Sequence, residues 1–270
     1  MIAALGMAAP RIAVHGHRGA RAVFPENTLA AFRHALQAGA DFLELDVAVT
    51  RDDVLVVSHD PGLNPQICTA PPGSRVIREL TLAELRAWDC GSLKHPQFPK
   101  QTPVPGSRVP TLDEVLELGQ GNSIQFNVET KIFSDKPHYT PSPERFAGLL
   151  LEAIDRHKMR ARVVVQSFDF RTLHAMKKLA PEIRLSALYQ SGDRDFVALA
   201  REAGAGIISP QYKLVTVEKV RAAHAVGLEV IPWTANTPEE WDKLIRAGVD
   251  AIITDDPAEL IRYLTSRKLR

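Results

Sequence analysis

Cysteine is scarce in this chain of 270 residues, which contains only Cys68 and Cys90. Two cysteines cannot build a disulfide scaffold, and their spacing does not match a CxxC metal or redox motif. We expect both thiols to be reduced and unpaired, with one disulfide between them as the alternative if the protein is exported. Hydrophobic residues make up 45% of the chain, which is ordinary for a globular protein with an apolar core.

The chain also lacks an excess of either charge. Its 33 lysines and arginines oppose 32 aspartates and glutamates, which leaves a net charge of +1. Such a balance offers no broad electrostatic surface for nucleic acid or for an anionic membrane. We therefore expect no nucleic-acid partner, and the oligomeric state stays open.

Long apolar runs are missing as well. The longest apolar opening, residues 1–10, is about half the length that a membrane helix needs, so we expect no stable membrane insertion. No lysine or arginine precedes Arg11, although Ala8 and Ala9 resemble the end of a secretory signal. A cytoplasmic location is favoured, and a periplasmic or secreted one is the alternative if the start of a signal peptide is missing.

Short apolar segments alternate with segments of helical periodicity along the chain. Predicted strands cover residues 11–17, 42–49 with an extension over 54–58, 124–131, 163–167, 185–189, 207–210, 229–234 and 251–254. Predicted helices begin near Thr28 and end at Gly39, and then cover 112–118, 143–157, 172–179, 196–203, 217–226, 238–247 and a last segment to about 265.

Eight strand–helix units in this length predict an α/β fold, a closed (β/α)₈ TIM barrel that forms a single domain over residues 11–265. A dinucleotide-binding fold would need GxGxxG after the first strand, and the segment 15–19 (HGHRG) does not supply it.

A proline-rich insertion follows the second strand unit. Residues 61–110 hold 9 of the 19 prolines, at positions 61, 65, 71, 72, 96, 99, 103, 105 and 110. Loops of this length usually carry function or are disordered. Because proline restricts the backbone, we expect a preformed wall or lid over the barrel mouth rather than a flexible tether.

Acidic residues lie at the strand ends where barrels place their active sites. Glu44 and Asp46 alternate with apolar neighbours and therefore face the same side of their strand, and Glu129 ends the third strand. Three buried carboxylates need a compensating charge. All-oxygen ligands favour one divalent cation, Mg²⁺ or Ca²⁺. The alternative is that these carboxylates only pair with Arg18 and Lys131.

Basic and titratable residues lie at the same strand ends. Arg18 and Lys131 are suited to hold an anion. His17 and His59 can exchange protons near neutral pH, and Asp60 is placed to orient His59. A metal site, cationic side chains and two histidines together indicate cleavage of a phosphate ester.

Seven fragments, in order and on the expected strand ends, resemble the glycerophosphodiester phosphodiesterase family. They are His17-Arg18-Gly19, Pro25-Glu26-Asn27-Thr28, Glu44-Leu45-Asp46, His59-Asp60, Asn127-Val128-Glu129-Thr130-Lys131, Trp233-Thr234-Ala235-Asn236 and Ile253-Thr254-Asp255. Each fragment is weak by itself, but together they extend over residues 12–265. The resemblance implies a metal-dependent hydrolase that releases glycerol 3-phosphate and an alcohol from a small phosphodiester.

The resemblance also implies a role for each matching residue. His17 and His59 would be acid and base, with His17 favoured as the base. Glu44, Asp46 and Glu129 would hold the metal. Arg18 and Lys131 would contact phosphate, and Trp233 would line the substrate pocket.

The insertion is longer than usual for this family, and the segment after Asp60 departs from the family pattern, so the alcohol is not indicated. The alternatives are a lysophospholipase D-type or other phosphodiesterase on the same barrel, or a catalytically silent barrel that binds phosphodiesters. Four further residues are weighed without a settled role: His15 as a packed wall residue, Gln166 and Tyr189 as pocket residues, and Asp255 as either a helix cap or a site residue.

Overall fold

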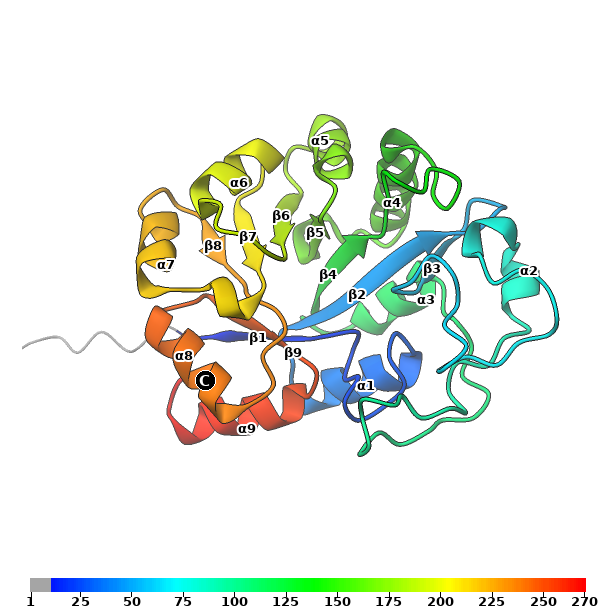
Figure 1. The fold of residues 1–270 in the computed structure, drawn as a ribbon, viewed down its shortest axis with the longest axis horizontal. Coiled ribbons are helices and arrows are strands. Elements are labelled where there is room, and N and C mark those ends of the chain that lie inside the picture. The colour runs from blue at the N-terminus through cyan, green and yellow to red at the C-terminus, as the bar shows by residue number, and fades with distance from the viewer. Residues whose placement is uncertain (1–10) are drawn as a thin grey trace, which may run out of the picture.

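The computed structural model describes residues 11–270 of the chain. Eight parallel strands form a barrel surrounded by helices (Figure 1). The strands, in hydrogen-bonded order, are β8 (Glu229–Val230), β7 (Ile207–Pro210), β6 (Arg184–Tyr189), β5 (Val163–Ser167), β4 (Gln125–Thr130), β2 (Phe42–Val49), β1 (Ala13–Gly16) and β9 (Ala251–Thr254). The predicted (β/α)₈ architecture is therefore confirmed.

The barrel is closed between β8 and β9 by irregular backbone hydrogen bonds. The N–H of Asp250 donates to the carbonyl of Val230 at 3.1 Å, and the N–H of Ile253 donates to that of Pro232 at 3.0 Å. The prediction of a strand over 229–234 is too long, because regular pairing ends at Val230. Pro232 has no N–H with which to continue the ladder.

Helices cover the outside of the barrel and follow the predicted segments closely. They are α1 (Leu29–Ala38), α3 (Leu112–Leu116), α4 (Pro143–Arg156), α5 (Phe170–Leu179), α6 (Phe196–Ala203), α7 (Val217–His224), α8 (Pro238–Ala247) and α9 (Pro257–Ser266). The Thr28 side chain caps α1 by accepting the N–H of Ala31, and Gly39 ends it with a φ of 87°. A left-handed residue at this point favours glycine, which has no Cβ to clash.

The segment after β2 leaves the barrel. Strand β3 (Leu55–Val57) turns back antiparallel on β2, and the chain then forms loops that lie to the right of the barrel in Figure 1, together with the short helix α2 (Leu82–Leu85). This insertion has an apolar cluster of its own, which packs on Ala48 and Val56 and includes Leu85 and Trp88.

Cys68 and Cys90 form a disulfide inside this cluster, so the expectation of reduced, unpaired thiols is wrong. The reason lies in the backbone of the insertion. Thr69 and Asp89 form an antiparallel bridge, in which each N–H donates to the other's carbonyl at 2.8 and 3.0 Å. This bridge places the neighbouring cysteines opposite each other, although 22 residues separate them in sequence.

The predicted signal-like segment, residues 1–10, lies outside the described residues. Within residues 11–270, none of the helices combines the length and the apolar character that are needed to cross a bilayer.

Candidate active site

The predicted site residues gather at the end of the barrel where the strands finish. A cavity of about 490 Å³ opens there and is lined by His17, Arg18, Glu44, His59, Glu129, Lys131 and Trp233. Of the predicted set, only Asp46, whose side chain is 1% exposed, is not part of the lining. Strands β1, β2 and β4 and the segments after β3 and β8 thus converge on one place.

Three carboxylates meet at the floor of this cavity. Alternation along β2 directs Glu44 and Asp46 to the same face, and the parallel register pairs Asp46 with Glu129 on β4. One oxygen from each of the three groups lies within 4.8 Å of the others. All three are buried, so their mutual repulsion is poorly screened.

The three carboxylates differ in their contacts with the positively charged side chains of Arg18 and Lys131. Arg18 Nε lies 3.3 Å from Asp46 Oδ2, and Lys131 Nζ lies 2.7 Å from Glu129 Oε1 and 3.6 Å from Asp46 Oδ1. Among the ion pairs of residues 11–270, none includes Glu44. Its oxygens instead accept the backbone N–H of Arg18 at 2.9 Å and the side-chain amide of Gln166 at 2.8 Å.

The carboxyl pKa values follow this distribution. Burial, together with the neighbouring Asp46 and Glu129, raises the pKa of Glu44 well above its usual range. Burial also raises the pKa of Glu129, although Lys131 opposes it. The pKa of Asp46 is lowered because His59, Arg18 and Lys131 outweigh the effect of burial.

The donor set fits a hard divalent cation. Arg18 and Lys131 compensate two carboxylates, as the alternative interpretation expected, but Glu44 stays buried without a cationic side chain. Oxygen ligands of this kind suit Mg²⁺ or Ca²⁺ rather than zinc. Glu44, Asp46 and Glu129 therefore form a candidate site for a divalent metal ion.

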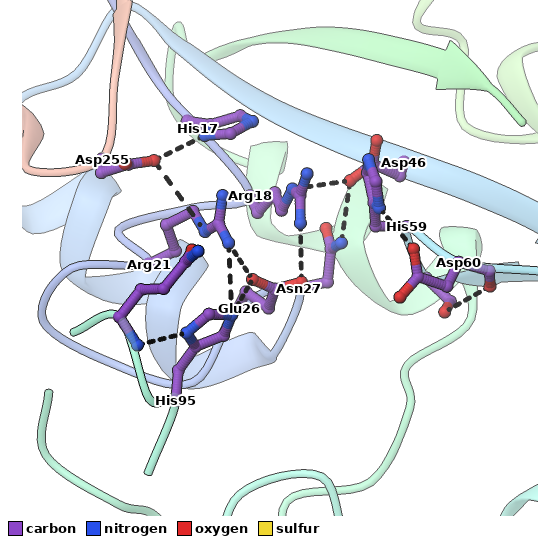
Figure 2. Close-up of polar contacts among 12 residues, drawn as sticks. His17, Arg18, Arg21, Glu26, Asn27, Asp46, His59, Asp60, His95 and Asp255 are labelled. Carbon is purple, nitrogen blue, oxygen red and sulfur yellow. Dashed lines mark hydrogen bonds and ion pairs between the residues drawn. The ribbon is translucent and has the colours of Figure 1, made fainter. Parts of the chain in front are cut away.

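The two histidines occupy different environments (Figure 2). The side chain of His17 is only 12% exposed, and its Nδ1 lies 2.5 Å from Asp255 Oδ1. Burial, helped by Arg18 and Arg21 and opposed by Asp255, lowers the pKa of His17 to about 4. The side chain of His59 is 34% exposed, and its Nδ1 lies 2.7 Å from Asp60 Oδ1, as predicted.

The loop between β1 and α1 carries the cationic side of the site. Arg18 has a φ of 49° and Gly19 a φ of 85°, and this tight turn brings the chain back over the barrel end. The Arg18 guanidinium donates to Glu26 Oε1 at 2.8 Å, and the side-chain amide of Asn27 donates to Asp46 Oδ2 at 3.0 Å. Glu26 and Asn27 thus orient the cation and the carboxylate of the site.

Sequence reasoning missed some of these residues. Glu26 and Asn27 stand in the Pro-Glu-Asn-Thr fragment, which contributed to the family resemblance but to which we assigned no role in the site. Asp255 faces His17, whereas its neighbour Asp256 caps α9. Arg21 lines the cavity although no pattern in the sequence marked it.

Other expectations have mixed outcomes. Gln166 does line the cavity, but Tyr189 does not and lies in an adjoining groove. His15 packs as a wall residue, stacked on Phe42 with 4.1 Å between ring centres, and burial lowers its pKa to about 3.

The insertion does not form the expected wall. None of residues 61–110 is among those that line the cavity, which is instead closed on its apolar side by residues such as Phe133, Phe168 and Trp233. The insertion instead approaches the site in two places. Residues such as Leu63 and Asn64 line a small pocket together with His59, and residues farther along contact the loop between β1 and α1. The side-chain amide of Gln101 donates to the carbonyls of Arg21 and Phe24 at 2.8 and 3.1 Å.

A (β/α)₈ barrel whose strand ends gather histidines, carboxylates and cations around one cavity has the form of a barrel enzyme. Comparison with known proteins identifies its family. The sequence model of the glycerophosphoryl diester phosphodiesterase family matches residues 17–259. A glycerophosphodiester phosphodiesterase of Caldanaerobacter subterraneus subsp. tengcongensis is 36% identical over 251 residues, which cover 93% of this chain and 97% of that protein.

Solved structures agree with this result. A protein of Silicibacter pomeroyi superimposes with a TM-score of 0.90 at 33% identity and covers 96% of this chain and 95% of its own. An Oleispira antarctica phosphodiesterase, in complex with the product sn-glycerol-3-phosphate, superimposes with a TM-score of 0.80 at 25% identity and covers 94% and 97%. The chain belongs to the glycerophosphoryl diester phosphodiesterase family, a family of phosphoric diester hydrolases.

Proposed function

We propose that this protein hydrolyses glycerophosphodiesters to glycerol 3-phosphate and an alcohol. The observation that carries the proposal is the convergence of His17 and His59 on one cavity with the buried carboxylates of Glu44, Asp46 and Glu129. The relative from Oleispira antarctica, whose structure holds sn-glycerol-3-phosphate, supports the same reaction for a similar barrel.

His17 is the general base in this proposal. Its Nδ1 is engaged by Asp255, so Nε2 is the nitrogen that is left to accept a proton from the attacking hydroxyl. A pKa of about 4 keeps the ring neutral at physiological pH, as a base must be. The attacking hydroxyl is that of water or of the glycerol group.

His59 is the general acid, which donates a proton to the leaving alcohol oxygen. Its contact with Asp60 orients the ring, and its partial exposure lets it recover a proton from solvent. Arg18 and Lys131 hold the phosphate oxygens, and the ring of Trp233 lines the side that faces the organic part of the substrate.

Glu44, Asp46 and Glu129 would hold one Mg²⁺ or Ca²⁺ ion. When bound, such an ion neutralises phosphate charge and lowers the pKa of a coordinated hydroxyl. Gln166 keeps Glu44 aimed into the cavity by donating to one of its oxygens.

A second candidate, cleavage of lysophospholipids at the equivalent bond, is favoured by the apolar side of the cavity. Phe168 is 42% exposed and meets Trp233 edge-on, with ring centres 5.6 Å apart. An adjoining groove of about 740 Å³ shares Ile132, Phe133 and Phe168 with the cavity, and could receive an acyl chain.

Turnover of glycerophosphocholine with Mg²⁺ or Ca²⁺, measured by coupled detection of glycerol 3-phosphate, tests the first proposal. Lysophosphatidylcholine in a parallel assay of released choline tests the second, and a higher kcat/KM for the lipid would favour it. Binding of either compound without turnover would instead identify a silent barrel. The His17→Asn variant serves as the blank in both assays.

A further inference from the structure

Arg21 is a largely enclosed cation at the edge of the cavity for which the proposed reaction has no role. It lies in the loop between β1 and α1, and its side chain is 12% exposed. Its Nη2 lies 2.9 Å from Glu26 Oε2, and its Nε lies 3.9 Å from Asp255 Oδ1. Both charged partners are therefore carboxylates of the protein (Figure 2).

Each of these carboxylates also holds a residue of the proposed machinery. The oxygen of Asp255 that faces Arg21 is the one that contacts His17 Nδ1 at 2.5 Å. The other oxygen of Glu26 accepts from Arg18 at 2.8 Å. Arg21 thus stands between the carboxylate that orients His17 and the carboxylate that orients Arg18.

The insertion holds Arg21 in this place. The Phe98 ring lies under the guanidinium, with 4.7 Å from its central carbon to the ring centre. The Gln101 side chain donates to the Arg21 carbonyl at 2.8 Å, and the N–H of Thr102 donates to the Val23 carbonyl at 2.7 Å. Residues 98–102 therefore fix both the backbone and the side chain of Arg21.

His95 lies next to the ion pair of Arg21 and Glu26. Its Nδ1 accepts the N–H of Gln97 at 3.1 Å, and the opposite ring nitrogen, Nε2, faces Glu26 and Arg21. That nitrogen lies 3.9 Å from Glu26 Oε2 and 3.4 Å from Arg21 Nη2. Its backbone N–H donates to Gln101 Oε1 at 2.9 Å, which ties the ring to the same segment.

We propose that Arg21 is a positioning residue for His17, and that residues 95–102 of the insertion serve to seat its guanidinium between Asp255 and Glu26. The inference rests on the proposed function, since it assigns His17 the role of base. The insertion then acts on catalysis through this cation and not as a wall of the cavity.

Charge explains why the arrangement matters. Asp255 by itself stabilises a protonated His17, whereas a second cation on the same carboxylate oxygen competes with that proton. Arg21 therefore favours the neutral ring that a base requires. The other charged or titratable groups that line the cavity with His17 are Arg18 on the same loop, Glu44 on β2, His59 after β3, Glu129 on β4 and Lys131 just after it.

The pH dependence of kcat/KM separates this role from a merely structural one. Arg21→Met removes the charge but keeps an apolar chain to pack on Phe98. We expect it to move the acidic limb of the profile upward by about one pH unit, the low end of the effect of a close charge, with little change in KM. Arg21→Lys, which keeps the charge, should restore the wild-type limb.

The part played by the insertion is tested with Phe98→Ala. Phe98→Ala should move the acidic limb of the kcat/KM profile upward by less than Arg21→Met does. The double variant should shift the limb no further than Arg21→Met alone. Arg75→Ala is the matched control, because Arg75 lies over the Trp88 ring at 5.2 Å in the same insertion but away from the cavity. It should leave the profile unchanged.

An acidic limb that stays in place in Arg21→Met, or additive effects of the two substitutions, would overturn the inference. Titration of the His17 ring by NMR, in the presence of Mg²⁺ and without substrate, provides an independent reading. A wild-type protein that cleaves no phosphodiester would refute the proposed function, whereas an unchanged His17 titration in Arg21→Met would refute this inference alone.

Discussion

At the scale of single residues, His17 and His59 differ in how far their side chains are exposed to solvent. Burial keeps His17 neutral, with a pKa of about 4, while Asp255 fixes its ring through Nδ1. His59 is partly exposed and fixed by the adjacent Asp60. This difference in exposure fits the proposed roles, in which His17 accepts a proton and His59 donates one.

We expect His17→Ala and His59→Ala each to lower kcat by about 10²- to 10⁴-fold, which is typical for loss of a positioned acid or base. Steady-state kinetics on glycerophosphocholine would measure this, and thermal unfolding would verify that both variants fold. His224→Ala is the control, because His224 contacts Asp250 at 2.9 Å on the outer surface. Activity within a few-fold of wild type in either variant would remove that histidine from the mechanism.

At the scale of elements, the insertion is organised around polar turns as well as its apolar cluster. The Asp89 carboxylate accepts the N–H groups of Gly91, Ser92 and Gly106 at 2.8, 3.0 and 2.9 Å, and the Ser92 hydroxyl at 2.6 Å. Burial opposes ionisation, but these hydrogen bonds outweigh it and lower the pKa of Asp89 to about 2. One side chain thus joins two turns of the insertion.

Asp89→Asn should destabilise the insertion by about 2 kcal/mol near pH 7, the usual range for hydrogen bonds to a charged group. Since the pKa is lowered by folding, the contribution is complete above the ordinary pKa of aspartate, near 4, and is lost as the pH falls to about 2. Limited proteolysis of residues 61–110 at several pH values would measure it. A difference from wild type that is equally large at pH 7 and pH 2 would show that the charge is not responsible.

At the scale of the whole molecule, the barrel brings together acidic residues that are far apart in sequence. Glu44 and Asp46 on β2 meet Glu129 on β4 because neighbouring parallel strands end at the same edge. Their repulsion opposes folding, so an ion that binds only the folded barrel should stabilise the entire domain.

Mg²⁺ or Ca²⁺ at a hundred times its dissociation constant should therefore raise the melting temperature by about 5–10 °C. Chelator should abolish activity and reverse this shift. Glu44→Gln should lose most of the response to the ion, whereas Glu84→Gln, on the surface of the insertion, should retain it. Equal shifts in wild type and Glu44→Gln would place the ion elsewhere.

The sequence by itself predicted the architecture, and it predicted most of the residues that are found together at the candidate site. Short apolar strands that alternate with segments of helical periodicity predicted the barrel. The spacing of Glu44 and Asp46 predicted that both side chains face the same side of their strand. These features depend on the periods of strands and helices, which are local properties of the chain.

Only the tertiary structure decided which distant residues meet. The contact of His17 with Asp255 joins residues 238 positions apart, and the disulfide depends on a backbone bridge inside a long irregular segment. Arg21 was missed for the same reason, since its partners come from the barrel and from the insertion. A local pattern cannot specify such pairings, because loops without a repeating geometry are positioned by the contacts they make after the barrel has formed.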